Sequence, residues 1–124
     1  MSLLTIKAFF ALMLFDLYIT RADFAALHSR VRSCSVSTAT PSSDAVGPIC
    51  AAVDMACIWY WKTVLCLQRS AATAWMLRRH GVSAQLVIGA QQVPFRAHAW
   101  VEVNGCVVND KADIATLYDV LDRC

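Results

Sequence analysis

The 124-residue sequence lacks the short motifs that mark several common functional classes. It contains no Cys-x-x-Cys pair and no cysteine and histidine cluster at zinc-ligand spacing, so a structural metal is not expected. No glycine-rich loop of the kind that holds phosphate groups occurs, and nucleotide binding therefore has no support. No internal repeat is present either. We accordingly predict no cofactor.

Charged residues are also scarce. They make up 16% of the chain, with a formal net charge of +2. The basic residues are scattered apart from Arg78-Arg79, which we interpret as a solvated helix end rather than a nucleic-acid patch. The chain is instead 58% hydrophobic, and apolar surface left exposed usually marks a partner. The length predicts one domain, residues 1–124.

The six cysteines are even in number, as a disulfide framework requires. The chain is nevertheless longer than most disulfide-stabilised scaffolds, and it has periodic apolar segments that can build a core. We therefore predict reduced cysteines in a cytoplasmic protein, with Cys106 exposed beside a turn and open to oxidation.

Residues 1–34 form an apolar region that could be mistaken for a signal peptide or a membrane span. Lys7 and Asp16 leave an uncharged run of only eight residues, 8–15, where about 20 are needed to cross a bilayer. No small-x-small cleavage site follows. We predict a buried or partner-facing helix that continues through apolar positions spaced by three and four, Phe24, Leu27 and Val31. Membrane contact is not expected, but it stays open.

Residues 35–47 are rich in Ser, Thr, Pro and Gly and predict a loop that leads into a core over 48–124. Pro48 suits the first position of a helix. Apolar residues then recur at helical spacing, at Ile49, Val53, Cys57, Tyr60 and Val64. The helix ends in an aromatic cluster, Trp59-Tyr60-Trp61, and we predict core packing for at least two of these three side chains.

The stretch 66–81 has the pattern of a helix with a defined end. Apolar residues recur at helical spacing, the last turn is cationic, and Gly81 suits a left-handed cap. Cys66 would lie in the first turn, where the helix dipole and unpaired N–H groups favour the thiolate. The thiolate attacks carbonyls, and the same N–H groups can hold the resulting oxyanion. Cys66 is therefore a candidate nucleophile.

Three β-rich runs follow, at 84–89, 97–103 and 106–110, with a loop at 90–94 between the first two. Asn104-Gly105 is a strong hairpin signal. A two-residue turn pairs 103 with 106 and puts His98 and Asp110 on opposite faces of the sheet. A bulge or a three-residue loop shifts the register by one and puts both on one face. If the two residues act together, the hairpin must contain such an irregularity.

The predicted class is α+β, with helices on one side of a small, mostly antiparallel sheet and the Cys66 helix packed on it. Residues 113–121 predict a short closing helix with its apolar side chains turned inward, namely Leu117, Val120 and Leu121.

The order Cys, His, Asp, with the cysteine on a helix, is typical of papain-like and transglutaminase-like sites. Five segments resemble the lasso-peptide maturation protease family: Cys66–Ser70, Leu77–Val82, Leu86–Gly89, Pro94–Val103 and Val108–Asp110. The resemblance covers roughly residues 60–120 and implies a transglutaminase-like core that removes the leader from a ribosomally made precursor. By this resemblance Cys66 is the nucleophile that forms a thioester, His98 is the general base and acid, and Asp110 orients His98.

Each of these three residues also has a purely structural interpretation. A single cysteine is more often a small buried filler, a histidine a hydrogen-bonded core residue, and an aspartate a turn residue. Their order, their separations of 32 and 12 residues, and their surroundings together favour the functional interpretation.

Papain-like sites place a side-chain amide upstream of the nucleophile as an oxyanion donor, but no Gln or Asn occurs in the fifteen positions before Cys66. The candidate donors are the backbone N–H groups of Cys66 and Leu67, or Trp61. Trp100 lies two positions after His98 on one strand face, so it either packs against the imidazole or lines the substrate cleft.

The resemblance implies a separate leader-binding protein that delivers the precursor peptide, because the chain has no obvious leader-recognition domain. It also implies an ATP-dependent lasso cyclase that uses the new α-amine. Two other functions remain. The same triad can serve a transglutaminase-like acyltransferase, or the chain can be a non-catalytic membrane-associated or scaffold subunit.

Overall fold

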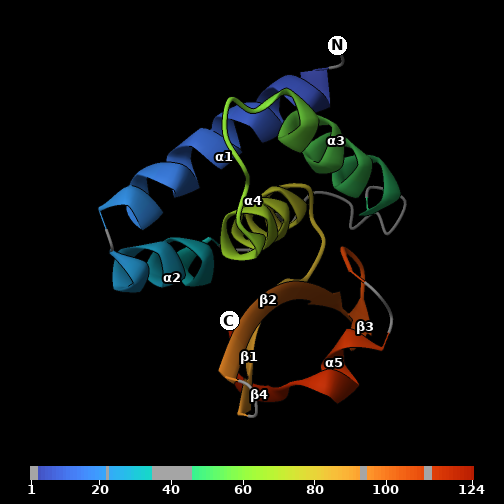
Figure 1. Cartoon of the computed structure of the whole chain (residues 1–124). Coiled ribbons are helices and arrows are strands. Elements are labelled where there is room, and N and C mark those ends of the chain that lie inside the picture. Colours follow the sequence, from blue (N-terminus) through green and yellow to red (C-terminus); the bar gives the residue numbers. More distant parts are fainter. Residues whose placement is uncertain (1–2, 22, 35–45, 93–94, 111–112) are drawn as a thin grey trace.

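Helix α4 (Cys66–Arg79) lies between a layer of helices and a four-stranded sheet (Figure 1). The structure is a computed structural model that describes residues 3–21, 23–34, 46–92, 95–110 and 113–124. The other elements are α1 (Leu3–Thr20), α2 (Phe24–Ser33), α3 (Val46–Trp59), β1 (Ala84–Gln92), β2 (Phe95–Val103), β3 (Cys106–Val107), α5 (Ile114–Leu117) and β4 (Asp119–Arg123).

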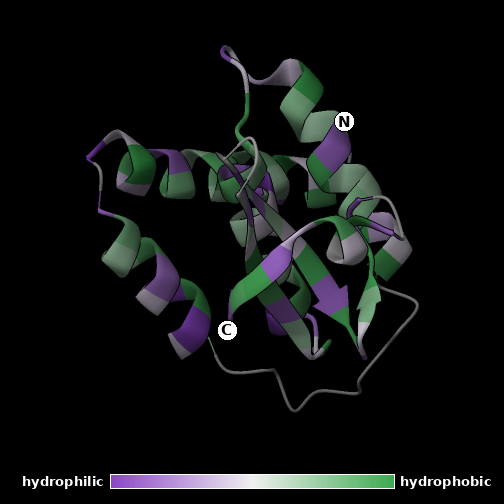
Figure 2. Cartoon of the chain, turned by 60° about the horizontal axis from the view of Figure 1, so that its bottom comes forward, coloured by the Kyte–Doolittle hydropathy of each residue, from purple (hydrophilic) through white to green (hydrophobic). Residues whose placement is uncertain are grey.

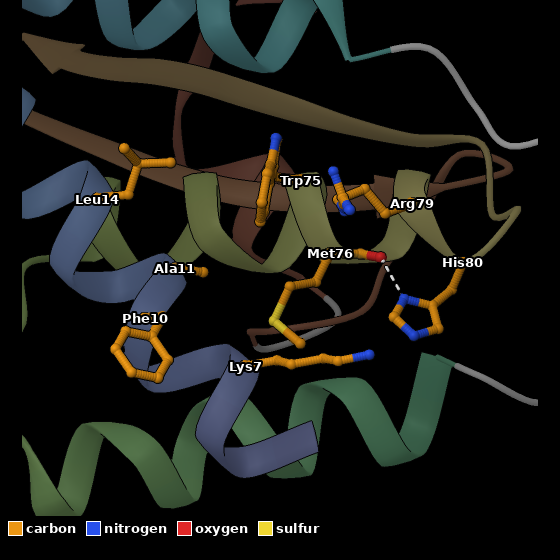
Figure 3. A pocket seen from close by; sticks show the side chains of 8 residues that line it. All are labelled: Lys7, Phe10, Ala11, Leu14, Trp75, Met76, Arg79 and His80. Carbon is orange, nitrogen blue, oxygen red and sulfur yellow. Dashed lines mark hydrogen bonds between the residues drawn. The ribbon is translucent and has the colours of Figure 1, made fainter. Parts of the chain in front are cut away.

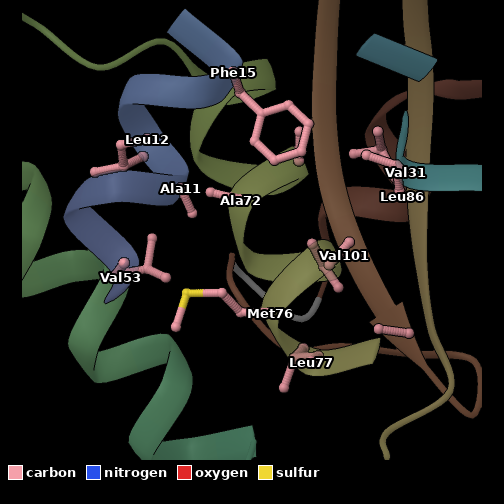
Figure 4. Packing of buried hydrophobic residues seen from close by; sticks show 14 of the residues in the cluster. Ala11, Leu12, Phe15, Val31, Val53, Ala72, Met76, Leu77, Leu86 and Val101 are labelled. Carbon is pink, nitrogen blue, oxygen red and sulfur yellow. The ribbon is translucent and has the colours of Figure 1, made fainter. Parts of the chain in front are cut away.

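The sheet is antiparallel throughout, with strand order β3-β2-β1-β4. One face packs against α4 through Leu86, Ala99 and Val101, which belong to the main core (Figure 4). The other face carries a smaller core of Val87, Trp100 and Ile114. The predicted α+β class, with the Cys66 helix on a small antiparallel sheet, is confirmed.

The N-terminal region forms two helices, so the prediction of one helix continuing through Val31 is wrong. The helical structure is interrupted between α1 and α2. The Asp23 side chain, just before α2, accepts a hydrogen bond from the Ala26 N–H at 3.1 Å. An N-cap of this kind satisfies a donor that would otherwise be unpaired at the start of α2. The break turns Leu27 and Val31 back into the main core, where both are buried.

Helix α1 is apolar on almost every side (Figure 2). Its 18 residues have a mean hydropathy of 1.8, a length and composition shared by membrane spans, signal sequences and core helices. Ala8, Leu12 and Phe15 are buried in the main core. The opposite side leaves large apolar side chains exposed: Leu3, Ile6, Phe10 and Leu17. Part of α1 is therefore core, and part is uncovered apolar surface.

Helix α3 begins at Val46, so Pro48 is its third residue rather than its first. The predicted loop before it lies for the most part, at 35–45, outside the described residues. The aromatic cluster at its end is mostly exposed: Tyr60 is buried, but Trp59 and Trp61 are 62% and 64% exposed. The prediction that two of the three pack in the core is wrong, because only Tyr60 points toward Asp16, to which it donates a 2.6 Å hydrogen bond.

Helix α4 ends as the sequence predicts. Gly81 has a φ of 85°, and the N–H groups of Gly81 and Val82 bond the carbonyls of Arg78 and Leu77. This pair of backbone hydrogen bonds is the Schellman motif, which needs a residue in the left-handed region. Small side chains, Ala71, Ala72 and Ala74, are fully buried along the helix and allow close packing.

Strands β1 and β2 are longer than predicted. β1 continues to Gln92 and pairs with β2 as far as Gln92↔Phe95, so the expected loop at 90–94 is wrong over 90–92, and 93–94 lie outside the described residues. The β2–β3 turn matches its signal: Asn104 and Gly105 both have positive φ, 53° and 79°. β3 itself is only two residues long.

The C-terminal segment is a single helical turn followed by a strand, not the predicted closing helix. β4 pairs with β1, and Cys124 and Leu86 exchange two backbone hydrogen bonds. Leu117 and Leu121 are exposed, while Val120 packs against the smaller core. Backbone pairing with β1, an interaction distant in sequence, overrides the local helical pattern.

Candidate active site

Cys66, His98 and Asp110 line one cavity of about 230 Å³, together with Val64, Arg69, Ser70 and Ala99; we refer to it as the polar cavity. Cys66 is the first residue of α4, and its side chain is exposed. His98 comes from β2, and Asp110 from the segment after β3. The tertiary structure thus brings together the three residues that the sequence singled out.

The His98 imidazole and the Asp110 carboxylate form a short hydrogen bond, with Nε2 and Oδ2 2.6 Å apart. Both side chains are about one-fifth exposed, at 23% and 20%. When Asp110 is ionised it can only accept, so Nε2 carries the proton. The neutral imidazole then has its lone pair on Nδ1, which is the nitrogen required to take a proton from another group.

The pairing of His98 with Asp110 depends on a break in the sheet. The turn has the two-residue register, with Val103 paired to Cys106 and Glu102 to Val107, which would put the two residues on opposite faces. The pairing ends after Val107, although the Val108 N–H still bonds the Val101 carbonyl. The predicted irregularity therefore exists, but it lies beyond β3 rather than in the turn.

Asn109 occupies the position of the break and makes three contacts. Its side-chain oxygen accepts the Val101 N–H at 2.8 Å, in place of the carbonyl of a regular strand. Its side-chain nitrogen donates to Ser70 Oγ at 3.0 Å, and its carbonyl accepts from Arg69. Ser70 Oγ in turn donates to the Ala99 carbonyl at 3.0 Å. This network ties the residue before Asp110 to both α4 and β2.

No pattern in the sequence predicted a role for Asn109, Ser70 or Arg69. The signal that could have indicated Asn109 is its place next to Asp110 in a run that must leave the strand register. Asparagine side chains replace backbone partners in such irregular segments more readily than most residues.

Aromatic rings on the face away from α4 support the His98 side chain. The imidazole stacks near Tyr118 and Trp100, with ring centroids 5.5 Å and 6.1 Å away. Trp100 is fully buried, donates from Nε1 to Glu102 and is absent from the lining of the two cavities that contain Cys66, so in the described part of the chain it packs against the imidazole. Gly89 makes this packing feasible, because a Cβ there would lie 2.7 Å from the Trp100 ring.

The first turn of α4 has no side-chain cap: Leu65 occupies the N-cap position without a side-chain hydrogen bond. Gln68 is not a substitute for the missing amide donor, because it is buried and its Nε2 donates to the Leu12 carbonyl at 2.8 Å. The backbone N–H groups of Cys66 and Leu67 therefore stay available for an anion beside the cysteine.

Trp61 does not line either of the cavities that contain Cys66 in the described part of the chain. It stacks on Tyr60, with centroids 4.2 Å apart, and contacts Phe9. The structure therefore places Trp61 on the surface, against Tyr60 and Phe9.

The structure gives no hydrogen bond between the Cys66 thiol and His98 among the residues that it describes, although both line the same cavity. Catalytic hydrogen bonds in unliganded sites are often long and shorten only when substrate binds. Side chains of these three kinds in one cavity can in principle serve as a nucleophile, a base and a residue that orients the base.

The remaining cysteines differ from Cys66 in their environment. Burial raises the pKa of the Cys50, Cys57 and Cys124 thiols above the ordinary value. A raised pKa keeps these thiols protonated and unreactive. Cys106 is exposed like Cys66, as predicted, but it lies beside the β2–β3 turn and is absent from the lining of both cavities at Cys66. No disulfide joins any of the six cysteines, all of which lie in the described ranges.

A larger cavity, of about 460 Å³, lies between α1 and the C-terminal half of α4 (Figure 3). It is lined by Lys7, Phe10, Ala11, Leu14, Trp75, Met76, Arg79 and His80. His80 donates from Nδ1 to the Met76 carbonyl at 2.8 Å, and no cysteine or serine lines the cavity. None of its lining side chains offers a thiol or a hydroxyl group as a nucleophile. No group of residues suited to hold a metal ion occurs in the described ranges.

Two comparisons relate this chain to known proteins. The family model described as the transglutaminase-like superfamily matches residues 11–122. The microcin J25-processing protein McjB of Escherichia coli is 39% identical over 56 residues, which are 45% of this chain and 27% of that protein. The chain thus matches only about a quarter of the length of this relative. No solved structure gives a significant match. The partial match supports the resemblance to lasso-peptide maturation proteases.

Proposed function

This chain belongs to the transglutaminase-like superfamily, and from that premise we propose that it is a cysteine peptidase that removes the leader from a ribosomally synthesised lasso-peptide precursor. The observation that carries the proposal is the shared cavity of Cys66, His98 and Asp110, with the His98–Asp110 hydrogen bond of 2.6 Å. The partial similarity to a protein named for processing microcin J25 supports a peptide substrate.

In the first step, His98 Nδ1 takes the proton of the Cys66 thiol, and the sulfur attacks the carbonyl carbon of the scissile peptide bond. The tetrahedral intermediate carries its negative charge on the former carbonyl oxygen. In this proposal the N–H groups of Cys66 and Leu67 donate to that oxygen, and the positive end of the α4 dipole stabilises the same charge; the uncapped first turn of α4 supports this role.

In the second step, the C–N bond breaks, and the imidazolium gives its proton to the departing amine, which is the new N-terminus of the core peptide. The leader stays bound to Cys66 as a thioester. His98 Nδ1 then takes a proton from water, whose oxygen attacks the thioester carbon, and the thiol is restored when the C–S bond breaks. Asp110 keeps the proton on Nε2 throughout.

The proposed partners follow from the resemblance and from the exposed apolar surface of α1. A separate leader-binding protein would present the precursor, and an ATP-dependent cyclase would consume the new α-amine. Leu3, Phe10 and Leu17 give α1 an uncovered apolar side of the kind that protein partners cover. We propose that the reaction takes place in the cytoplasm, where cysteines stay reduced.

The test is to incubate the precursor with this protein, with and without the leader-binding partner, and to weigh the products. We expect leader and core peptides from the wild type and none from Cys66→Ala. Cys106→Ala is the matched control, because it removes the other exposed cysteine, and it should cleave at the normal rate.

The product masses also separate hydrolysis from acyl transfer. A leader with a free carboxylate supports a peptidase, whereas a leader joined to an amine indicates an acyltransferase with the same triad. Normal cleavage by Cys66→Ala would refute the assignment of the nucleophile. Iodoacetamide that labels Cys106 in preference to Cys66 would count against an activated Cys66.

A further inference from the structure

A second cavity, of about 280 Å³, shares Cys66, His98 and Ala99 with the polar cavity. Apart from those two residues, its lining is entirely aliphatic: Leu65, Leu67, Ile88, Ala97 and Ala99. We refer to it as the apolar cavity. The polar cavity, in contrast, contains Arg69, Ser70 and Asp110. The nucleophile and the base thus lie at the boundary between a charged and an aliphatic pocket.

The apolar cavity arises where the first turn of α4 meets the sheet. Ala97 and Ala99 lie on β2, and Ile88 is directly opposite Ala99 on β1. Since two of these three side chains are methyl groups, they do not fill the space below Leu67. Leu65 is 52% exposed, so the cavity opens to solvent beside the nucleophile.

We propose that the apolar cavity binds one aliphatic side chain of the peptide substrate, on the acyl side of the scissile bond; this inference rests on the proposed peptidase function. The volume is below the roughly 300–1,000 Å³ of pockets that hold a whole small ligand, so one side chain is a suitable occupant. Removal of its apolar area from water supplies the binding energy.

The position of the cavity limits which residue can occupy it. Cys66 and His98 are part of its wall, and each peptide residue spans at most about 3.3–3.6 Å. The occupant therefore belongs to the residue whose carbonyl is attacked or to the residue before it.

The chemistry assigns the acyl side to the apolar cavity and the amine side to the polar one. The departing amine becomes charged, and water must then enter from the side that the amine has left. Arg69, Ser70 and Asp110 can hydrate that side, while the aliphatic walls cannot.

The experiment measures alkylation of Cys66 in the full chain by two series of peptidyl chloromethyl ketones, acetyl-Xaa-chloromethyl ketone and acetyl-Xaa-Gly-chloromethyl ketone. The thiolate displaces chloride and forms a C–S bond, so no partner protein is needed. Xaa is Gly, Val, Leu, Asp or Lys. Peptide mapping identifies the alkylated cysteine. Iodoacetamide, a reagent that carries no amino-acid side chain, measures the reactivity of the thiol itself.

In at least one series we expect Val or Leu to react about 10- to 200-fold faster than Gly, the range for filling a hydrophobic pocket. Asp and Lys should react no faster than Gly, because the cavity offers no partner for their charge. Ala97→Leu, which fills the cavity from an exposed strand position, should reduce the preference to less than threefold, with each ketone rate divided by the iodoacetamide rate of the same variant. Ala51→Leu, an exposed substitution on α3, is the matched control and should keep the preference.

The outcomes separate this inference from the proposed function. Labelling of Cys66 by iodoacetamide without any preference among the ketones would overturn the aliphatic subsite and leave the peptidase proposal intact. A preference that survives in Ala97→Leu would also overturn it, because the side chain would then bind elsewhere. Failure of every reagent to label Cys66 would count against the nucleophile and the subsite together.

Discussion

The two ends of α4 are built in opposite ways. At the C-terminal end, Gly81 and Val82 satisfy the last carbonyls, and the Arg78 guanidinium donates to carbonyls of α2, β1 and the chain end: Val31, Arg32, Cys34, Ala84 and Cys124. At the N-terminal end, Leu65 provides no cap, and Cys66 is exposed between two cavities. The sequence interpretation of Arg78 as a solvated residue is wrong.

The difference shows how one helix can serve both stability and chemistry. The hydrogen bonds of Arg78 fix α4 relative to the sheet, about 20 Å from Cys66 at 1.5 Å per residue. The N–H groups at the other end can then stay unpaired in the folded protein and be used by a substrate. The anchored C-terminal end thus holds α4 in place while the N–H groups at its N-terminal end stay unpaired.

The largest expected effect is at the unsatisfied end. His98→Ala should lower the turnover of the precursor by about 10³-fold or more, because it removes the base, and Asp110→Asn by about 10²-fold or more, because it removes the carboxylate that fixes the tautomer. The measurement is single-turnover cleavage, with circular dichroism to check the fold. An unchanged rate in Asp110→Asn would remove that residue from the proposed triad.

The anchored end should respond in stability rather than in chemistry. Arg78→Met leaves several carbonyls without their donor and should lower the free energy of unfolding by about 3 kcal/mol or more. Arg79→Met is the matched control, because Arg79 is the exposed neighbour of Arg78 and lies over the Trp75 ring at 4.8 Å. Arg79→Met should lower the free energy of unfolding by about 0.5–1 kcal/mol. Urea denaturation of both variants measures the difference, and equal losses would contradict the role of Arg78 as the anchor.

Asn109 tests the connection between α4 and the His98–Asp110 pair. Asn109→Ala leaves the Val101 N–H without its partner and releases the segment that carries Asp110, so kcat should fall about 10-fold with little change in KM. Asn104→Gly, in the turn of the same hairpin, keeps a residue that tolerates positive φ and should leave kcat unchanged. If both variants behave alike, the network does not position Asp110.

The smallest effect concerns the tether between α1 and the segment before Cys66. Burial of Asp16 would raise its pKa, but hydrogen bonds from Lys62 and Tyr60 outweigh this and lower the pKa below 3.8. The ionised form therefore stabilises the fold above about pH 4, and this contribution is lost as the pH falls through the lowered value.

Asp16→Asn should accordingly lower the free energy of unfolding by about 1–2 kcal/mol at pH 7 and by less at pH 3. Urea denaturation at the two pH values measures the contrast. A loss that is as large at pH 3 as at pH 7 would contradict an electrostatic tether.

The segments with strong local signals were predictable from the sequence. The helix from Cys66 to Arg79, its Gly81 cap and the Asn104-Gly105 turn each depend on residues that are neighbours in the chain. The sequence also singled out the three candidate residues that line one cavity, because their order and spacing resemble a known family. The contradictory register of His98 and Asp110 even indicated that an irregularity must exist.

Other features depended on contacts between distant segments. The chain end pairs with β1 instead of forming a helix, Trp59 and Trp61 stay on the surface, and Asn109 replaces a strand partner of Val101. None of these follows from local pattern, because each is decided by which remote backbone or side chain is available.

The sequence by itself determined the α+β class, the helix that begins at the cysteine, and the identity of the candidate nucleophile, base and orienting residue. Only the tertiary structure decided where the strand register breaks, which carbonyls Arg78 satisfies, and that an aliphatic and a polar cavity flank Cys66. The physical reason is range: helix periods, caps and tight turns are set within a few residues, whereas cavities and networks form between segments that meet only in the folded chain.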